Sequence, residues 1–194
     1  MSAHVKESGE KEINMRKSGT VCLLMCLFCL LANDISAEDG LIKDKAIESV
    51  KIGDSVDKIF TTFKSRYQVI DNTKPGATRT IILFSGKQKT ATFFVDQHNQ
   101  VFMIEIYKGY QTQDKIGPGS TISQAIHIYG TGSITPTDVG YLMTFKKLNG
   151  IGFLLTNNDI PKEFRNIPDD VFTPEQEEKI LSFGNVRISA IQIE

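Results

Sequence analysis

The chain has 194 residues, with 22 Lys and Arg against 23 Asp and Glu, and its formal net charge is −1 at pH 7. This balance lacks the basic excess that indicates binding to nucleic acid or to an anionic membrane surface. The cysteines, Cys22, Cys26 and Cys29, all lie near the N-terminus. The rest of the chain therefore offers no disulfide, thiolate metal site or cysteine nucleophile.

The first feature in chain order is an apolar segment at residues 19–32, which follows Arg16 and Lys17 and precedes Ala37. A basic flank, a short apolar core and a small residue at the cleavage position are typical of a secretory signal peptide. The segment is shorter than the roughly 20 residues that span a bilayer. We therefore predict cleavage near Ala37 and a periplasmic or secreted protein without strong affinity for membranes.

Alternatives at the N-terminus stay open. Residues 1–14 are hydrophilic and Met15 begins a more ordinary leader, so Met15 is a candidate for the true start. The apolar run could also be retained as a membrane anchor. Lipidation is disfavoured because it needs a small residue before the cysteine, and Val21, Met25 and Phe28 occupy those positions.

Two later segments share one pattern, and each opens with Lys-Ile-Gly, at Lys51 and at Lys115. A hydroxyl residue placed to cap a helix follows in each, Ser55 in the first and Ser120 or Thr121 in the second. Apolar residues then recur at the i, i+3, i+4, i+7 spacing of one helix face. They are Val56, Ile59, Phe60 and Phe63 in the first segment and Ile122, Ala125, Ile126 and Tyr129 in the second.

Strand patterns follow each predicted helix. In the first copy we expect strands at residues 78–84, 90–95 and 101–107, and in the second at residues 141–146, 151–156 and 186–193. Asn149-Gly150 is a strong tight-turn signal between two of them. The sequence thus predicts an α+β fold of two tandem repeats, each a helix followed by a three-stranded antiparallel meander. The repeats would occupy residues 38–110 and 111–194 and bury each other's exposed faces.

The second predicted repeat carries an insertion at residues 157–185 before its last strand. Within it, Thr173-Pro174-Glu175-Gln176 has the pattern of a capping box with proline at the first helical position. We expect a loop and then a short helix that ends at Gly184.

The chain resembles small envelope proteins of Gram-negative bacteria. The motifs are a strand and turn within residues 92–107, the helix that follows Lys115-Ile116-Gly117, and Pro168-Asp169-Asp170 ahead of the final strand. They are similar to those of a family of uncharacterised, envelope-stress-regulated lipoproteins. More loosely, the duplicated module resembles the outer-membrane assembly lipoproteins and the tandem-repeat β-lactamase inhibitor proteins. This resemblance implies a compartment and a fold, and no activity.

Catalytic, metal-binding and cofactor motifs are not apparent. His98 and His127 lack further ligands at a recognisable spacing, so we expect no metal. Residues 117–121 are explained by a turn and a helix cap rather than by a phosphate-binding loop. The paired acids, Asp169-Asp170 and Glu177-Glu178, are expected on a solvated surface. The sequence therefore predicts no catalytic residue and no cofactor.

The remaining candidates suit protein recognition, because Tyr, Phe and Arg are enriched in interfaces. Candidate binding residues are Tyr107, Tyr110, Phe164, Arg165, Asp169 and Asp170, and the alternative for the aromatic ones is core packing. We expect a non-enzymatic binding or accessory protein of inhibitor, immunity or assembly-factor type, with another protein as its partner. The second hypothesis is a small-molecule or lipid carrier with a pocket between sheets and helices. The third is a cell-wall hydrolase that uses Asp169, Asp170 or Glu177.

Overall fold

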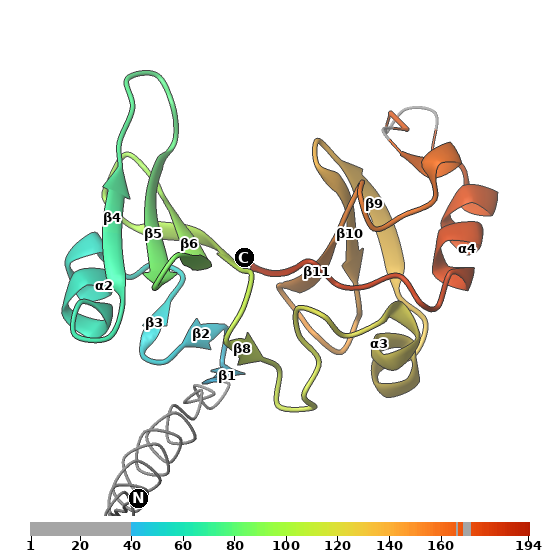
Figure 1. The fold of residues 1–194 in the computed structure, drawn as a ribbon, viewed down its shortest axis with the longest axis horizontal. Coiled ribbons are helices and arrows are strands. Elements are labelled where there is room, and N and C mark those ends of the chain that lie inside the picture. The colour runs from blue at the N-terminus through green and yellow to red at the C-terminus, as the bar shows by residue number, and fades with distance from the viewer. Residues whose placement is uncertain (1–39, 166, 169–171) are drawn as a thin grey trace, which may run out of the picture. The chain divides into compact units, whose positions relative to one another are not determined.

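A computed structural model describes residues 40–165, 167–168 and 172–194, which belong to one compact unit (Figure 1). The described part confirms the α+β class. Its helices are α2 (Val56–Phe63), α3 (Ile122–Tyr129), α4 (Pro174–Ser182) and the short 3-10 helix η1 (Lys162–Phe164). None of these helices is long and apolar enough to cross a membrane. The predicted signal peptide lies outside the described residues.

Eight antiparallel strands form the larger sheet, in the order β4-β5-β6-β7-β12-β11-β10-β9. Their bounds are β4 Gln68–Asn72, β5 Arg79–Ser85, β6 Gln88–Val95, β7 Val101–Ile106, β9 Ser133–Thr137, β10 Gly140–Thr144, β11 Ile151–Thr156 and β12 Ala190–Ile193. The order is symmetric about the central pair, in which Ile106 of β7 lies opposite Ile191 of β12. The two predicted repeats, 38–110 and 111–194, are therefore joined within one sheet.

The prediction of three-stranded meanders is wrong, since four strands follow each of α2 and α3. The extra strands are the two sheet edges, β4 and β9. Strand β4 reads Gln-Val-Ile-Asp-Asn and has little of the apolar content that marks a strand, and β9 contains Pro136. Strand β4 pairs with β5, and β9 pairs with β10. This pairing holds the two edge strands in an extended conformation that their own sequences do not predict.

A second, four-stranded sheet has the order β3-β2-β1-β8 and was not predicted. It consists of β1 (Gly40–Lys43), β2 (Ala46–Ile47), β3 (Val50–Lys51) and β8 (Tyr110–Gln111). Its strands are short, but Ile42, Ile47 and Val50 join the hydrophobic core. This sheet brings the first described residues beside the segment that links the two halves of the larger sheet.

Helices α2 and α3 pack on one face of the large sheet, which we call the helix face. Phe63 of α2 lies 5.7 Å from Phe93 of β6, and Tyr129 of α3 lies 6.1 Å from Phe153 of β11, measured between ring centroids. The predicted apolar stripes are confirmed, with Phe60 and Ile126 half-buried and the other members buried. These contacts leave the opposite face, the outer face, to the side chains of alternate strand residues.

The helix starts differ in how they are capped. Thr121 accepts a hydrogen bond from the Gln124 backbone N–H and forms a complete capping box, as does Thr173 with Gln176. Ser55 occupies the N-cap position of α2, but its side chain makes no capping hydrogen bond. The short helix expected before the last strand is present as α4, and it lies with η1 between β11 and β12.

Candidate functional site

The outer face of the eight-stranded sheet is the candidate binding surface. Strand register defines it, because residues directly opposite each other in antiparallel strands point to the same side. One row of paired residues crosses most of the sheet and contains Ile70, Ile82, Thr92, Glu105, Gln192, Gly152 and Thr144. The row changes from aliphatic at β4 to polar at the centre, and it has no side chain at Gly152.

An apolar band covers the half of the outer face formed by β4 to β7. It consists of Ile70, Ile82, Phe94, Phe102 and Met103. Ile70 is 38% exposed and Phe102 is 44% exposed, although each belongs to a paired strand. The rings of Phe94 and Phe102 lie 6.3 Å apart. Large apolar side chains that remain this accessible on a sheet face are typical of an interaction surface.

A β-bulge explains why Phe102 projects from this face. The register between β6 and β7 shifts at Phe94 and Val95, so that Phe94 pairs with Met103 while Val95 pairs with Val101. Phe102 is the additional residue on β7 and has no partner directly opposite. The bulge interrupts the alternation of β7 side chains between the two faces, and the Phe102 ring therefore stays accessible beside Phe94.

A polar cluster occupies the centre of the outer face. The Tyr107 hydroxyl donates a hydrogen bond to Glu105 Oε2, and Lys89 Nζ lies 4.1 Å from the centre of the Tyr107 ring. Burial raises the pKa of Tyr107, and the hydrogen bond and charge of Glu105 act in the same direction. Burial also lowers the pKa of Lys89, whereas the charge of Glu105 opposes this shift. Both shifts follow from the partial burial of the two groups.

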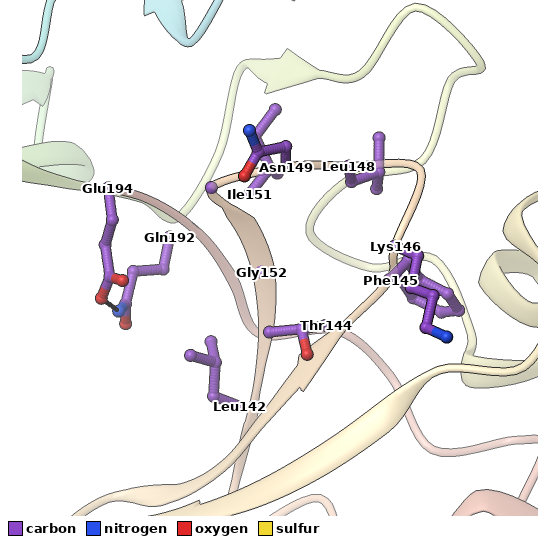
Figure 2. A pocket seen from close by; sticks show the side chains of 11 residues that line it. Leu142, Thr144, Phe145, Lys146, Leu148, Asn149, Ile151, Gly152, Gln192 and Glu194 are labelled. Atoms are coloured by element: carbon purple, nitrogen blue, oxygen red, sulfur yellow. Dashed lines mark hydrogen bonds between the residues drawn. The ribbon is translucent and has the colours of Figure 1, made fainter.

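A hollow of about 440 Å³ lies on the other half of the outer face (Figure 2). It exists because Gly152, which pairs with Thr144 and Gln192, contributes no side chain to its row. Leu142 leans over the gap, and a Cβ at Gly152 would lie 2.7 Å from Leu142 Cδ1. The β10–β11 hairpin forms one wall, and Gln192 with Glu194 lies across from it.

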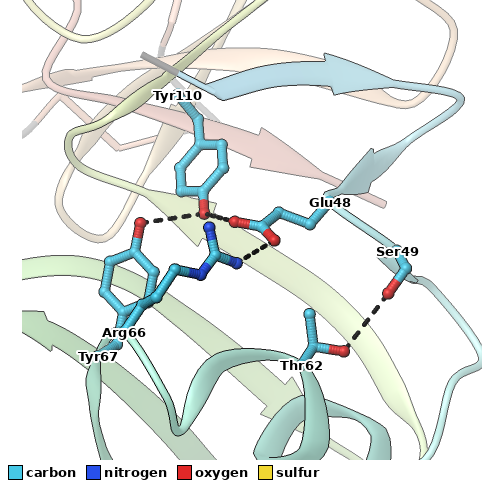
Figure 3. A network of polar contacts seen from close by, with 6 residues as sticks. All are labelled: Glu48, Ser49, Thr62, Arg66, Tyr67 and Tyr110. Atoms are coloured by element: carbon cyan, nitrogen blue, oxygen red, sulfur yellow. Dashed lines mark hydrogen bonds and ion pairs between the residues drawn. The ribbon is translucent and has the colours of Figure 1, made fainter. Parts of the chain in front are cut away.

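A separate polar network ties the second sheet to the end of α2 (Figure 3). Tyr110 donates a 2.9 Å hydrogen bond to Glu48 Oε1, and Tyr67 lies 3.2 Å from Tyr110, measured between hydroxyl oxygens. Arg66 forms an ion pair with Glu48 Oε2. Burial raises the pKa of Tyr110, and Tyr67 and Glu48 add to the shift. Tyr110 is buried, at 3% exposed, while Glu48 and Arg66 reach the surface, so the network joins the second sheet to the end of α2.

The structure separates the predicted binding residues. Tyr107 lies in the outer-face cluster, and Tyr110 is buried in the network that also contains Glu48. Phe164 packs its ring 5.5 Å from Phe183, and its carbonyl accepts a 2.5 Å hydrogen bond from the Tyr141 hydroxyl. Arg165 Nε donates to the carbonyl of Ile160 at 2.9 Å.

Phe164 and Arg165 thus hold the insertion in place through contacts within the chain. Asp169 and Asp170 lie outside the described residues. The predicted sites therefore do not converge, and Tyr107 is the described candidate that reaches the outer face.

The residues expected to be chemically inert have structural contacts. Glu177 accepts a 2.9 Å hydrogen bond from the backbone N–H of Ile134, which fixes α4 beside β9. The Gly117 backbone N–H donates to Ser120 Oγ at 3.1 Å, as a turn before a helix requires. Within the described ranges, no three His, Cys, Asp or Glu side chains come together as metal ligands.

The apolar band is not predicted from the sequence, because the strands expected at Phe94 and Phe102 do not by themselves indicate which face of the sheet each ring occupies. The alternation in residues 90–95 places Phe93 on one face and Phe94 on the other, which is a usable signal. The bulge at Phe102 has no comparable signal in the sequence, since it depends on the pairing of β6 with β7.

No protein-family model matches the chain, and no curated protein matches it. Among solved structures, the chain is similar to the uncharacterized protein yfeY from Escherichia coli, with 13% sequence identity and a TM-score of 0.46. The match covers 66% of this chain and 81% of that chain.

Proposed function

We propose that the protein is an exported, non-enzymatic accessory protein of the bacterial envelope that binds another protein through its outer face. The observation that carries the proposal is the exposed apolar band, with Phe102 44% exposed on the face that the repeat helices leave free. The apolar band lies beside the polar cluster of Glu105, Tyr107 and Lys89. An apolar centre with aromatic residues and a polar margin is the usual composition of a protein interface.

Export is the second part of the proposal. It is supported by the basic, apolar and small-residue pattern of residues 16–37 and by the resemblance to envelope proteins. Inhibitor, immunity and assembly-factor roles all fit, since each requires a stable folded surface and none requires catalysis.

We further infer that the two halves are copies of one ancestral unit. Each begins with Lys-Ile-Gly, continues with an eight-residue helix, and ends in four antiparallel strands. The last strands of the two units, β7 and β12, pair at the centre of the sheet. Such an arrangement makes a wide outer face from two small modules.

The test is affinity capture of partners by residues 38–194 from an envelope extract of the source organism, with quantitative mass spectrometry. Phe102→Glu should abolish enrichment of the partner, because a charge replaces the most exposed ring of the apolar band. The matched control is Ile128→Glu, since Ile128 is 40% exposed but lies on α3. Equal recovery by Phe102→Glu and the unmodified protein would exclude this surface.

A small-molecule or lipid carrier is the second candidate, and the hollow beside Gly152 favours it. Its volume of about 440 Å³ falls within the range of ligand pockets, which is roughly 300–1,000 Å³. The hollow lies on the outer face, whereas buried side chains fill the space between sheet and helices where a pocket was expected. Native mass spectrometry of protein purified from its own host tests this function, and a co-purifying ligand lost in Gly152→Ala would support it.

The hydrolase hypothesis gains no support from Glu177, whose carboxylate is hydrogen-bonded to the β9 backbone. Incubation with purified wall polymer tests this hypothesis, and released product would contradict the non-enzymatic proposal.

A further inference from the structure

The two edge strands of the large sheet are protected to different degrees. At β9, the backbone N–H of Ile134 donates to Glu177 of α4, and Pro136 has no N–H to donate. Because Ile134 and Pro136 are two residues apart, their backbone nitrogens point to the same side of the strand, away from β10. Figure 1 shows α4 alongside this strand. Strand β9 therefore offers few free donors to another strand.

Strand β4 also has a helix beside it, α2, but no side chain among the described residues accepts a hydrogen bond from its backbone N–H groups as Glu177 does at β9. It contains no proline, and β5 is its single strand neighbour among the described residues. The charged side chain of Asp71 is turned onto Arg79 of β5, with Oδ2 and Nη2 2.5 Å apart. Ile70, at the middle of the strand, is 38% exposed on the outer face. An edge strand with free backbone groups and an exposed aliphatic residue is a template for strand pairing.

We propose that β4 pairs with β4 of a second copy of this chain, antiparallel and across a two-fold axis at Ile70. The axis stands perpendicular to the sheet, so the two eight-stranded sheets become one and their helices remain on the same face. This inference does not depend on the proposed function of the outer face.

The sequence of β4 is complementary to itself in this register. Ile70 lies opposite Ile70 of the second copy, and Gln68 lies opposite Asn72, so the outer face pairs aliphatic with aliphatic and amide with amide. On the helix face Asp71 lies opposite Val69, and no like charges meet directly. The aliphatic centre also joins the two apolar bands, because Ile82 of β5 flanks Ile70 in each copy. A second copy therefore fits the edge better than an arbitrary extended segment does.

The first experiment measures the mass of residues 38–194 in solution by light scattering, up to about millimolar concentration. The proposal expects a concentration-dependent dimer, and a monomer throughout this range would overturn it. Ile70→Lys should raise the dissociation constant of the dimer at least tenfold, because it places two like charges opposite each other. An equimolar mixture of Ile70→Lys and Ile70→Glu should restore the dimer, and failure of the mixture to do so would contradict the register.

Thr135→Lys is the matched control, since Thr135 is an exposed outer-face residue on the protected edge. It should leave the dimer unchanged, and an equal loss would contradict the choice of edge. Phe102→Glu should also dimerise normally, which separates this test from that of the outer-face function.

A cysteine cross-link reports the register directly, because residues 38–194 contain no cysteine. Ile70→Cys should form a disulfide-linked dimer on mild oxidation, whereas Gln68→Cys should not, since it faces Asn72 of the other copy. Cross-linking of Gln68→Cys in preference to Ile70→Cys would overturn the proposed pairing.

Discussion

The Tyr110 hydroxyl donates a 2.9 Å hydrogen bond to Glu48 Oε1, and this bond connects β8 to the turn that follows β2. Glu48 is also paired with Arg66, just beyond the end of α2. One carboxylate thus joins three elements that are far apart in the sequence. The second sheet is small, so we expect these hydrogen bonds and this ion pair to make a measurable contribution to the free energy of unfolding.

Tyr110→Phe is the first prediction. The substitution keeps the buried ring and removes the hydroxyl, so the free energy of unfolding should fall by about 1 kcal/mol, the usual net contribution of one hydrogen bond. Urea unfolding measures the change. Tyr67→Phe is the control, because it leaves the bond between Tyr110 and Glu48 in place. A larger loss for Tyr67→Phe than for Tyr110→Phe would contradict this assignment.

Alkaline pH should weaken the fold through Tyr107 and Tyr110, which are half-buried and buried. Both Tyr107 and Tyr110 have a pKa raised above the usual 10.0. Below pH 10 the phenols are protonated in the folded and unfolded states, so their full contribution is present. Above it the unfolded phenols ionise while the folded ones do not, and stability falls by up to about 1.4 kcal/mol per pH unit for each group.

Urea unfolding between pH 8 and about 12 tests this dependence. The double variant Tyr107→Phe and Tyr110→Phe should show a shallower decline above pH 10 than the unmodified protein. Parallel curves would mean that these two groups do not govern the alkaline transition.

The sequence of this protein predicts its helices better than its edge strands and its second sheet. The stripe of Val56, Ile59 and Phe63 has the helical period and is buried as a unit. By contrast, β4 and the strands of the second sheet are short, and pairing with distant residues orders them. The exposure of Phe102 and the hollow at Gly152 also follow from cross-strand register, which no local pattern encodes.

The helix caps provide a third prediction. Thr121→Ala and Thr173→Ala should each lower the free energy of unfolding by about 1 kcal/mol, because each removes a side-chain acceptor from a complete capping box. Ser55→Ala should cost clearly less, since the Ser55 side chain makes no capping hydrogen bond. Chemical denaturation of the three variants gives the comparison, and equal losses would contradict the observed difference in capping.

Substitution by alanine should destabilise the protein to different degrees at two glycines, Gly140 of β10 and Gly152 of β11. A Cβ at Gly140 would lie 2.0 Å from the Leu155 backbone oxygen, and φ is +153° there, so Gly140→Ala should cost more than about 2 kcal/mol. At Gly152 the obstacle is the mobile end of Leu142, so Gly152→Ala should cost less than about 1 kcal/mol. Thermal unfolding ranks the two, and the reverse order would contradict the contacts described.

The last prediction contrasts two phenylalanines on opposite faces of the sheet. Phe63 of α2 is fully buried against Phe93, so Phe63→Ala should lower the free energy of unfolding by about 3–5 kcal/mol. Phe102 is 44% exposed and lies outside the core, so Phe102→Ala should lower the free energy of unfolding by less than about 1 kcal/mol. If the outer face binds a partner, Phe102→Ala should nevertheless weaken binding at least fivefold, as loss of an interface aromatic does. Denaturation and affinity capture on the same preparations separate the two effects, and a Phe102→Ala protein that is unstable as well as binding-deficient would assign Phe102 to the core.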